Sequence, residues 1–287
     1  MTTTPTCDAC TAPYLAWQLE LTCVLWRCPR CGYIRRDLDL ARANARADEY
    51  GGSVRADAVR TFLTDQRIRR RLGPRLAGRV LEIGCGDGSL ARRLASLASD
   101  VVAIDPHAVS GRRDGVTFVS AAAGRSFDIE GGPFDVVIAI HVLEHVPDLI
   151  ETLSTVHRLL RPGGVLYAIT PNADSAGLRV WGEAWWMLED PTHVRFLSAA
   201  SVPFLAAATG FTDSHATPLR TDSLMVEAAS TVRMRRSRSR REAAETSSAV
   251  AALSVATLPL TLGLRTVRPR WCPSIEVVMT RDDSRPR

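Results

Sequence analysis

The chain of 287 residues contains no lysine, so all 36 of its basic side chains are arginines. We interpret this first as the coding bias of a GC-rich genome. The absence of a Gly-Lys-Ser/Thr sequence excludes a P-loop and argues against nucleoside triphosphate binding. The net charge of +5 permits an anionic partner, such as a phosphate, a nucleic acid or a membrane surface, but does not require one.

Long hydrophobic runs are also missing. The longest apolar tract, residues 249–264, contains Ser254, Thr257, Pro259 and Thr261 and is shorter than the roughly 20 residues that span a bilayer. The opening residues "MTTTPTCDAC" lack the charged and apolar regions of a signal peptide. We therefore expect a cytoplasmic protein, in which cysteines stay reduced and more often bind metal than form disulfides.

Two C-x-x-C pairs near the amino terminus predict a zinc site. Four cysteines form these pairs: Cys7, Cys10, Cys28 and Cys31. Each short turn directs two sulfurs at one ion, and four thiolates leave no open position for a substrate, so the zinc is expected to be structural. Free or redox-active thiols are the alternative. Cys23 and Cys272 are expected in the core rather than among the ligands.

A polar, Arg-rich segment follows the cysteines and is interpreted as a helical connector, residues 37–77. Within it, "ADAVRTFLTDQRIRRRL" places Val59, Phe62, Leu63 and Ile68 near helical spacing, and Gly73-Pro74 ends the pattern. The arginines are interpreted as a solvated face rather than a binding patch.

The stretch "RVLEIGCGDGSLARRLASL" predicts a strand, a glycine turn and a helix. Gly84, Gly86 and Gly88 allow the backbone to approach a ligand closely, and the helix that follows offers unpaired N–H groups. The spacing is G-x-G-x-G rather than the dinucleotide fingerprint G-x-G-x-x-G. The next strand, "DVVAIDPH", ends at Asp105, where a carboxylate can accept hydrogen bonds from both hydroxyls of a ribose.

Strands alternate with helices further along the chain, which predicts a parallel sheet with helices on both faces. Ligands of such sheets lie at the carboxyl ends of the strands. These ends fall at residues 84–88, 105, 121–123, 140–145 and 170–172.

The ordered motifs "VLEIGCGDGSLARRLA", "VVAIDP", "FDVVIAIHVLEHVPD" and "LLRPGGVLYAITPN" resemble those of class I S-adenosylmethionine-dependent methyltransferases over about residues 78–220. The resemblance implies an α/β fold with a doubly wound, seven-stranded, mostly parallel sheet. It also implies that Glu82 and the glycine loop contact the methionine part of the cofactor, and that Asp105 binds the ribose. The cofactor-binding residues expected from it are Glu82, Gly84, Cys85, Gly86, Gly88, Asp105, Pro106, Ala122, Ile140 and His141.

One departure from the family pattern concerns the adenine. An acid often follows the third strand in this family, whereas this chain has Ala121, Ala122 and Ala123 there. Either backbone groups bind the adenine or Asp128 reaches it from the following loop; we favour the backbone.

The transfer site is expected after the fourth strand, in "HVLEHVPD". His141 is favoured to face the transferred methyl, with Glu144 and His145 one helical turn further, and His193 as a candidate base for a hydroxyl proton. Structural roles remain open for all four: hydrogen bonding for His145, a helix cap for Glu144, capping or packing for His193. Two roles are open for a group of four large apolar residues, either a lid over the substrate or helix core: Trp181, Trp185, Trp186 and Met187.

The stretch "DPTHVRFLS" is similar to relatives of quinone-biosynthesis O-methyltransferases, many of which act on sugars, glycolipids and other small molecules. Such proteins often carry an N-terminal C-x-x-C … C-x-x-CG zinc module. The resemblance implies methyl transfer, at oxygen, to a sugar, a lipid-linked glycan or a secondary metabolite. An rRNA methyltransferase that grips RNA with its zinc module is the alternative enzyme, although we do not expect a nucleic-acid partner. A non-catalytic zinc-binding adaptor is the alternative of another class.

The carboxyl-terminal third is interpreted as an insertion, at about residues 230–270, before a final strand in "WCPSIEVVMTRDD". It combines an Arg-rich stretch, residues 233–241, with the apolar segment 249–264. This combination suits peripheral contact with the inner face of a membrane and hence a lipid-linked acceptor. We accordingly divide the chain into a zinc module (1–36), a connector (37–77) and a methyltransferase domain (78–287).

Overall fold

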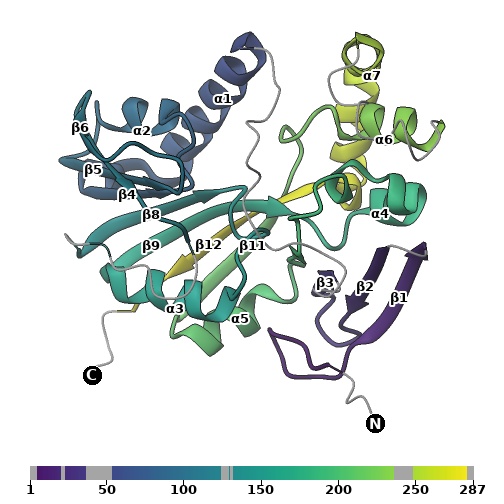
Figure 1. Ribbon diagram of the computed structural model, residues 1–287, viewed down its shortest axis with the longest axis horizontal. Helices are drawn as coiled ribbons and strands as arrows, with labels where there is room; N and C mark the ends of the chain where they lie inside the picture. Colours follow the sequence, from purple (N-terminus) through teal and green to yellow (C-terminus); the bar gives the residue numbers. More distant parts are fainter. Residues whose placement is uncertain are drawn as a thin grey trace. The chain divides into compact units, whose positions relative to one another are not determined.

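A computed structural model describes residues 5–20, 23–36, 54–123, 129, 132–235 and 248–282 (Figure 1). The chain forms two compact units. One comprises residues 1–49, 170–204 and 215–276, and the other comprises residues 50–169, 205–214 and 277–287. The domain boundaries proposed from the sequence stay a prediction, and residues 37–53 of the connector lie outside the described residues.

A parallel sheet forms the centre of the second unit. Its strands are β4 (Arg79–Ile83), β5 (Asp100–Asp105), β7 (Val116–Ser120), β8 (Phe134–Ile140) and β9 (Leu160–Pro171). Their central residues are mostly apolar and buried, with Glu82 of β4 as a polar exception, which is typical of parallel strands covered on both faces. β4 lies between β5 and β8, with Ile83 opposite Ile104 and Ala139. The predicted doubly wound α/β fold is therefore confirmed.

The complete sheet has eight described strands, in the order β11-β12-β9-β8-β4-β5-β7-β6. β11 (Asp213–Leu219) and β12 (Ser274–Thr280) extend one end of it. The expected number of seven is wrong by one, because the three-residue β6 (Gly111–Arg113) pairs antiparallel with β7 at the other edge. No apolar alternation marks this exposed strand in the sequence.

The helices around this sheet are α1 (Val54–Leu72), the 3-10 helix η1 (Gly73–Ala77), α2 (Ser89–Leu94), α3 (Leu149–Leu159) and α5 (Val202–Thr209). Two of them connect parallel strands: α2 joins β4 to β5, and α3 joins β8 to β9. Figure 1 shows α1 and α2 on one face of the sheet and α3 on the other. α3 begins where the Asp148 side chain accepts a hydrogen bond from the N–H of Glu151, which caps the helix.

A small antiparallel sheet contains the amino-terminal strands β1 (Leu15–Glu20), β2 (Cys23–Arg27) and β3 (Ile34–Arg36). Its fourth strand is the two-residue β10 (Arg195–Phe196), which pairs antiparallel with β3. A strand almost 160 residues later in the sequence therefore completes the sheet of the cysteine-rich segment.

The remaining helices of the first unit are α4 (Ala176–Trp181), η2 (Gly182–Ala184), η3 (Trp186–Leu188), α6 (Val226–Arg235), α7 (Ser248–Val267) and η6 (Pro269–Trp271). Trp185 and Met187 are fully buried in the core cluster of this unit, as helix core rather than as a lid. The Trp181 and Trp186 rings pack against the same cluster and are partly buried.

The helix α7 is longer than the apolar tract from which it was predicted. It has 20 residues, and Ala249–Val267 is long and apolar enough, by length and composition, to cross a membrane. The expectation that this segment is too short is therefore wrong, because the helix continues through Arg265 and Thr266. Residues 236–241 of the Arg-rich stretch, and residues 242–247 after it, lie outside the described residues.

Candidate functional site

The glycine loop joins β4 to α2 at the carboxyl end of the sheet. The N–H groups of Gly84 and Cys85 both donate to the carbonyl of Ile104, at 2.8 and 3.0 Å, which ties the loop to the end of β5. Gly84 has a φ of +72°, and a Cβ there would lie 2.4 Å from Val142 Cγ2. Gly86 has a φ of +51° and nothing within 4 Å of a Cβ position. The loop backbone is therefore open on the side of Gly86.

Glu82 places a carboxylate beneath this loop. It lies in the middle of β4, and its side chain is only 4% exposed. Its Oε2 atom has no hydrogen-bond partner among the described residues. Burial raises the pKa of Glu82 to about 8; the charges of Asp87 and Asp105 act in the same direction, and the backbone N–H of Ala91 opposes them. An unpartnered buried carboxyl group fits a cationic group such as the amino end of an amino acid.

Asp105 ends β5 beside the loop. Its Oδ2 accepts a hydrogen bond from the N–H of Gly86 at 3.0 Å, and its Oδ1 accepts one from the N–H of His107 at 2.9 Å. Two backbone donors hold the carboxylate in place, and each carboxylate oxygen can accept a further hydrogen bond. A half-buried carboxylate oriented in this way fits the vicinal hydroxyls of a ribose.

The expected adenine region lies at the ends of β5 and β7. Pro106 is exposed, the N–H of Ala121 donates to the carbonyl of Asp105 at 3.2 Å, and Ala122 is exposed. Asp128, the alternative adenine ligand, lies outside the described residues. Cys85 is buried in the glycine loop, and burial raises the pKa of its thiol to about 12. A neutral, inert thiol there contributes shape rather than charge.

The strand β8 ends at Ile140 and is followed by His141, whose φ of +54° is unusual for a residue with a side chain. His141 Nδ1 lies 3.1 Å from Oε1 of Glu144, which is completely buried. Glu144 therefore does not cap the next helix, since Asp148 does. The next residue, His145, is half-buried, and its N–H donates to the carbonyl of Val142. The contact of Val142 with Gly84 brings this turn against the glycine loop.

His193 belongs to the other compact unit. It is buried, and its Nδ1 lies 2.7 Å from the carbonyl oxygen of Met187. Just before it, Asp190 Oδ1 accepts hydrogen bonds from the N–H and the hydroxyl of Thr192, which closes a tight turn. The predicted catalytic residues therefore divide, with His141, Glu144 and His145 in one unit and His193 in the other.

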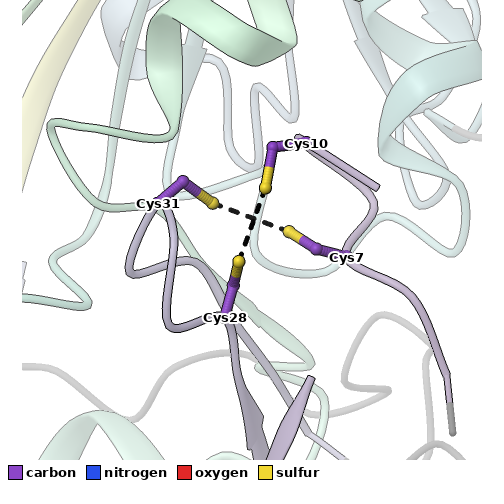
Figure 2. Close-up of side chains that lie close together, drawn as sticks. All are labelled: Cys7, Cys10, Cys28 and Cys31. Atoms are coloured by element: carbon purple, nitrogen blue, oxygen red, sulfur yellow. Dashed lines mark hydrogen bonds between the residues drawn. The ribbon is translucent and has the colours of Figure 1, made fainter. Parts of the chain in front are cut away.

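The four predicted metal ligands converge (Figure 2). Cys7 Sγ lies 3.6 Å from Cys31 Sγ, and Cys10 Sγ lies 3.4 Å from Cys28 Sγ. All four sulfurs lie within 4.8 Å of one another and are buried. Zinc–sulfur bonds of about 2.3 Å in a tetrahedron put neighbouring sulfurs about 3.8 Å apart. Burial raises the pKa of Cys7 to about 11, so a cation is needed to hold such a cluster as thiolates.

Sequence reasoning missed the buried polar groups behind the cysteines. Asp8, between the first two cysteines, accepts hydrogen bonds from Arg195 of β10, from Arg35 at 3.1 Å and from the hydroxyl of Tyr33 at 3.3 Å. The hydroxyl of Ser198 donates to the carbonyl of Cys31. Asp8 carries a local signal, because a carboxylate between two buried cysteines needs a cationic partner, but Arg195 lies too far along the chain to be inferred.

Comparison with known proteins agrees with this geometry. The family model described as a methyltransferase domain matches residues 56–216, which is more than half of the chain. The chain belongs to this family. The matched region of the methyltransferase domain contains the glycine loop, Asp105, His141 and His193.

Several ubiquinone biosynthesis O-methyltransferases are similar to parts of this methyltransferase-domain protein. The protein of Caulobacter vibrioides is 39% identical over 106 residues, which cover 32% of this chain and 40% of that protein. The protein of Rhizobium etli is 33% identical over 132 residues, which cover 42% of this chain and 51% of that protein. The chain thus spans about half, or less, of the length of these relatives.

Solved structures support the fold of the methyltransferase domain. Phosphoethanolamine N-methyltransferase 2 of Haemonchus contortus, solved with S-adenosyl-L-methionine, has a TM-score of 0.51 at 18% identity, over 77% of this chain and 53% of that chain. A sarcosine dimethylglycine methyltransferase of Galdieria sulphuraria has a TM-score of 0.51 at 16% identity, over 81% of this chain and 89% of that chain. At these identities the likeness extends to the fold alone.

Proposed function

We propose that this protein transfers a methyl group from S-adenosylmethionine to a hydroxyl oxygen of a small acceptor. The observation that carries the proposal is the buried carboxyl group of Glu82, which lies beneath an open glycine loop with its Oε2 unpartnered among the described residues. Membership of the methyltransferase-domain family and the O-methyltransferase names of its relatives support the same reaction.

Three groups of this chain would hold the cofactor. Glu82 would bind the amino end of the methionine part, the open backbone at Gly86 would lie against the chain of that part, and Asp105 would accept hydrogen bonds from the ribose hydroxyls. When bound, the cofactor supplies a methyl group on a positively charged sulfur. The protein then mainly positions the acceptor in line with that methyl group. Correct orientation of two reactants can lower the activation free energy by up to about 7 to 11 kcal/mol.

His141 is the proposed base for the acceptor hydroxyl. When Glu144 accepts a hydrogen bond from Nδ1–H of His141, the neutral imidazole presents Nε2 as an acceptor. The complete burial of Glu144 makes this interaction stronger than it would be in water. Glu144 is thus a positioning residue, and His141 the residue that would take the proton.

The acceptor is proposed to be a small molecule: a sugar, a lipid-linked glycan or a secondary metabolite. The relatives of the chain are named for ubiquinone biosynthesis, which is consistent with an oxygen acceptor on a small organic molecule. A structural zinc ion held by Cys7, Cys10, Cys28 and Cys31 completes the proposal, because four buried thiolates leave no position for substrate.

Isothermal titration with S-adenosylmethionine tests the cofactor part of the proposal. We expect saturable binding by the wild type and at least tenfold weaker binding by Asp105→Ala, equivalent to about 1.4 kcal/mol. The control is Asp213→Ala, which removes an exposed carboxylate from β11 and should bind like the wild type. An adaptor without catalytic function would show no heat for any of the three proteins.

A second titration separates the small-acceptor enzyme from the RNA-directed alternative. Binding of rRNA fragments that weakens steeply with salt would favour an RNA methyltransferase and contradict our proposal. Formation of S-adenosylhomocysteine with hydroxylated small molecules, in the absence of RNA, would support it.

A further inference from the structure

The helix α7 presents an apolar stripe to solvent. The exposed residues recur at steps of three and four, so they share one face of the helix. They include Val255, Ala256, Pro259, Leu260, Gly263 and Val267. Val255 and Leu260 are each 74% exposed and Val267 is 75% exposed. A contiguous exposed apolar face of this length marks an interaction surface.

Three hydroxyl groups of this helix are paired within the helix itself. The hydroxyls of Ser254, Thr257 and Thr266 each donate to the carbonyl four residues earlier in the helix, at 2.7 Å. Arg265 is the only charged residue of the helix and is completely buried. Contact of the stripe with hydrocarbon therefore leaves these hydroxyls and the Arg265 guanidinium hydrogen-bonded.

Arg265 fastens the carboxyl-terminal part of α7 to its own unit. Its guanidinium has five N–H donors, and five acceptors surround it. Glu227 of α6 accepts from Nε at 2.7 Å and from Nη2 at 2.6 Å. The remaining acceptors are the carbonyls of Arg220, Asp222 and Ser223. Moving α7 away from this position would separate the buried ion pair of Arg265 and Glu227 and leave both charges without a partner.

The amino-terminal part of α7 is also packed. Val250 is fully buried against Ala228 and Ala229 of α6, and Leu253 packs on the same cluster. Figure 1 shows the two helices side by side. Because α7 is held near both of its ends, we expect it to lie along a surface rather than to cross a bilayer.

An apolar groove runs beside the stripe. It has a volume of about 250 Å³ and lies between α4, α6, α7 and η6. The rings of Trp181 and Trp271 meet edge to face in its wall, with centroids 5.7 Å apart, and Leu253, Leu260 and Leu264 line the α7 side. An apolar cavity of about 150 Å³ already admits benzene, so this groove is large enough for part of a hydrocarbon chain. Leu260 belongs to both the groove and the stripe, which makes the two surfaces continuous.

Positive charge flanks the apolar surface. Arg268 and Arg270 are exposed immediately after α7, and Arg235 is exposed at the end of α6. Trp271, half-buried next to Arg270, lies where an interfacial tryptophan is expected. Exposed arginines beside an uncharged apolar helix complement the anionic headgroups of a lipid surface.

We propose that α7 docks in the plane of an anionic lipid bilayer through this stripe, and that the adjoining groove holds one acyl or isoprenoid chain of a membrane lipid. The flanking arginines contact the headgroups, and the uncharged stripe enters the acyl boundary. The site lies outside the glycine loop, Asp105 and His141, so it goes beyond methyl transfer and is tested without it.

Vesicle flotation tests the docking. The wild type is expected to bind vesicles of phosphatidylglycerol and phosphatidylcholine and to bind pure phosphatidylcholine much more weakly. The variant Val255→Gln/Leu260→Gln should lose at least tenfold in partition coefficient. The matched control Val59→Gln/Val109→Gln changes two exposed valines of the other unit and should bind within twofold of the wild type. Circular dichroism and S-adenosylmethionine titration confirm that each variant is folded.

Three results would overturn the docking proposal. The first is failure of the wild type to bind anionic vesicles, and the second is equal binding by the Val255→Gln/Leu260→Gln variant. The third is a wild-type dimer that this variant converts to a monomer, because a second copy of the chain would then cover the stripe. Resistance of bound protein to alkaline carbonate extraction would show a spanning helix and contradict the in-plane orientation.

Tryptophan quenching tests the groove separately. Lipids brominated on their acyl chains are expected to quench the wild type, and the variant Trp181→Phe/Trp271→Phe should lose at least half of that quenching. Unchanged quenching in this variant would overturn the groove assignment. If the same variant still binds vesicles, the loss of quenching is caused by a change in the groove and not by a loss of docking.

Discussion

Arg195 donates a hydrogen bond to the carboxylate of Asp8, although 187 positions of sequence separate them. The same guanidinium donates to the hydroxyl of Tyr33 at 3.1 Å. Arg36 extends the connection by donating to the carbonyls of Leu188 and Asp190, at 2.8 and 2.9 Å. The cysteine-rich segment and residues 188–198 are therefore held together by buried charge-assisted hydrogen bonds.

Loss of zinc is expected to destabilise this assembly. Elemental analysis should find one zinc per chain in the wild type and none in Cys28→Ser/Cys31→Ser. We expect the variant, or the chelated wild type, to melt at least about 5 °C lower, because the metal contributes folding free energy. The control Cys272→Ala removes another buried cysteine and should keep the full zinc content. Full zinc content in the variant lacking Cys28 and Cys31 would contradict the assignment.

Breaking the ion pair tests the role of Arg195. Arg195→Met removes one of the two arginines that bind Asp8, while Arg35 and the Tyr33 hydroxyl remain, and should cost about 1.5 to 3 kcal/mol of unfolding free energy. Urea unfolding measures the cost. The double variant Asp8→Asn/Arg195→Met should recover part of it, since the carboxylate that lost one of its two arginine partners is then gone. Additive losses in the double variant would show that the two side chains act independently.

The pKa of Glu82 predicts a dependence of stability on pH. The folded-state pKa of about 8 exceeds the ordinary value of about 4.3, so the native state binds more protons than the unfolded state between these values. The contribution of Glu82 to stability therefore falls as pH rises from about 4 to about 8 and is constant above that. Glu82→Gln should remove this slope, and denaturant unfolding from pH 5 to 9 measures it.

Cofactor binding should reverse the effect of burial on Glu82. A cationic amino group beside the carboxylate lowers its pKa, so binding at pH 7 is expected to release up to about one proton. Titrations in buffers of different ionisation enthalpy count the protons released. Glu82→Gln should bind the cofactor more weakly and release none. Equal release by both proteins would place the proton elsewhere.

The pairing of His141 with Glu144 predicts a division between catalysis and cofactor binding. His141→Ala should lower kcat by about 10² to 10⁴-fold while leaving the Kd of S-adenosylmethionine nearly unchanged. Glu144→Gln should lower kcat less and shift the pH profile, because it removes the charge that orients the imidazole. The control is His215→Gln, which changes an exposed histidine of β11 and should keep the wild-type kcat. The rate of S-adenosylhomocysteine production with a hydroxylated acceptor measures kcat. An unchanged kcat in His141→Ala would exclude His141 as the base.

Much of the sheet could be predicted because parallel strands and their turns carry local signals. The apolar run "RVLEI" and the three glycines after it identify β4 and its loop without reference to any other segment. β6 could not be predicted in this way, since three exposed residues become a strand only by pairing with β7. The length of α7 was underestimated because Arg265 ends the apolar tract in the sequence, whereas Glu227 neutralises it in the folded chain.

Features that depend on neighbouring residues could be predicted without the fold: the spacing of the cysteine pairs, the glycine turn between β4 and α2, and the carboxylate at the end of β5. Four other features became evident in the folded chain alone: β10 completes the amino-terminal sheet, Asp8 contacts Arg195, Glu144 contacts His141, and one side of α7 is exposed. Local backbone geometry and hydrophobic period act over a few residues. Pairing between distant charges and strands is selected only when the whole chain packs, because each group must then find a partner or remain buried without one.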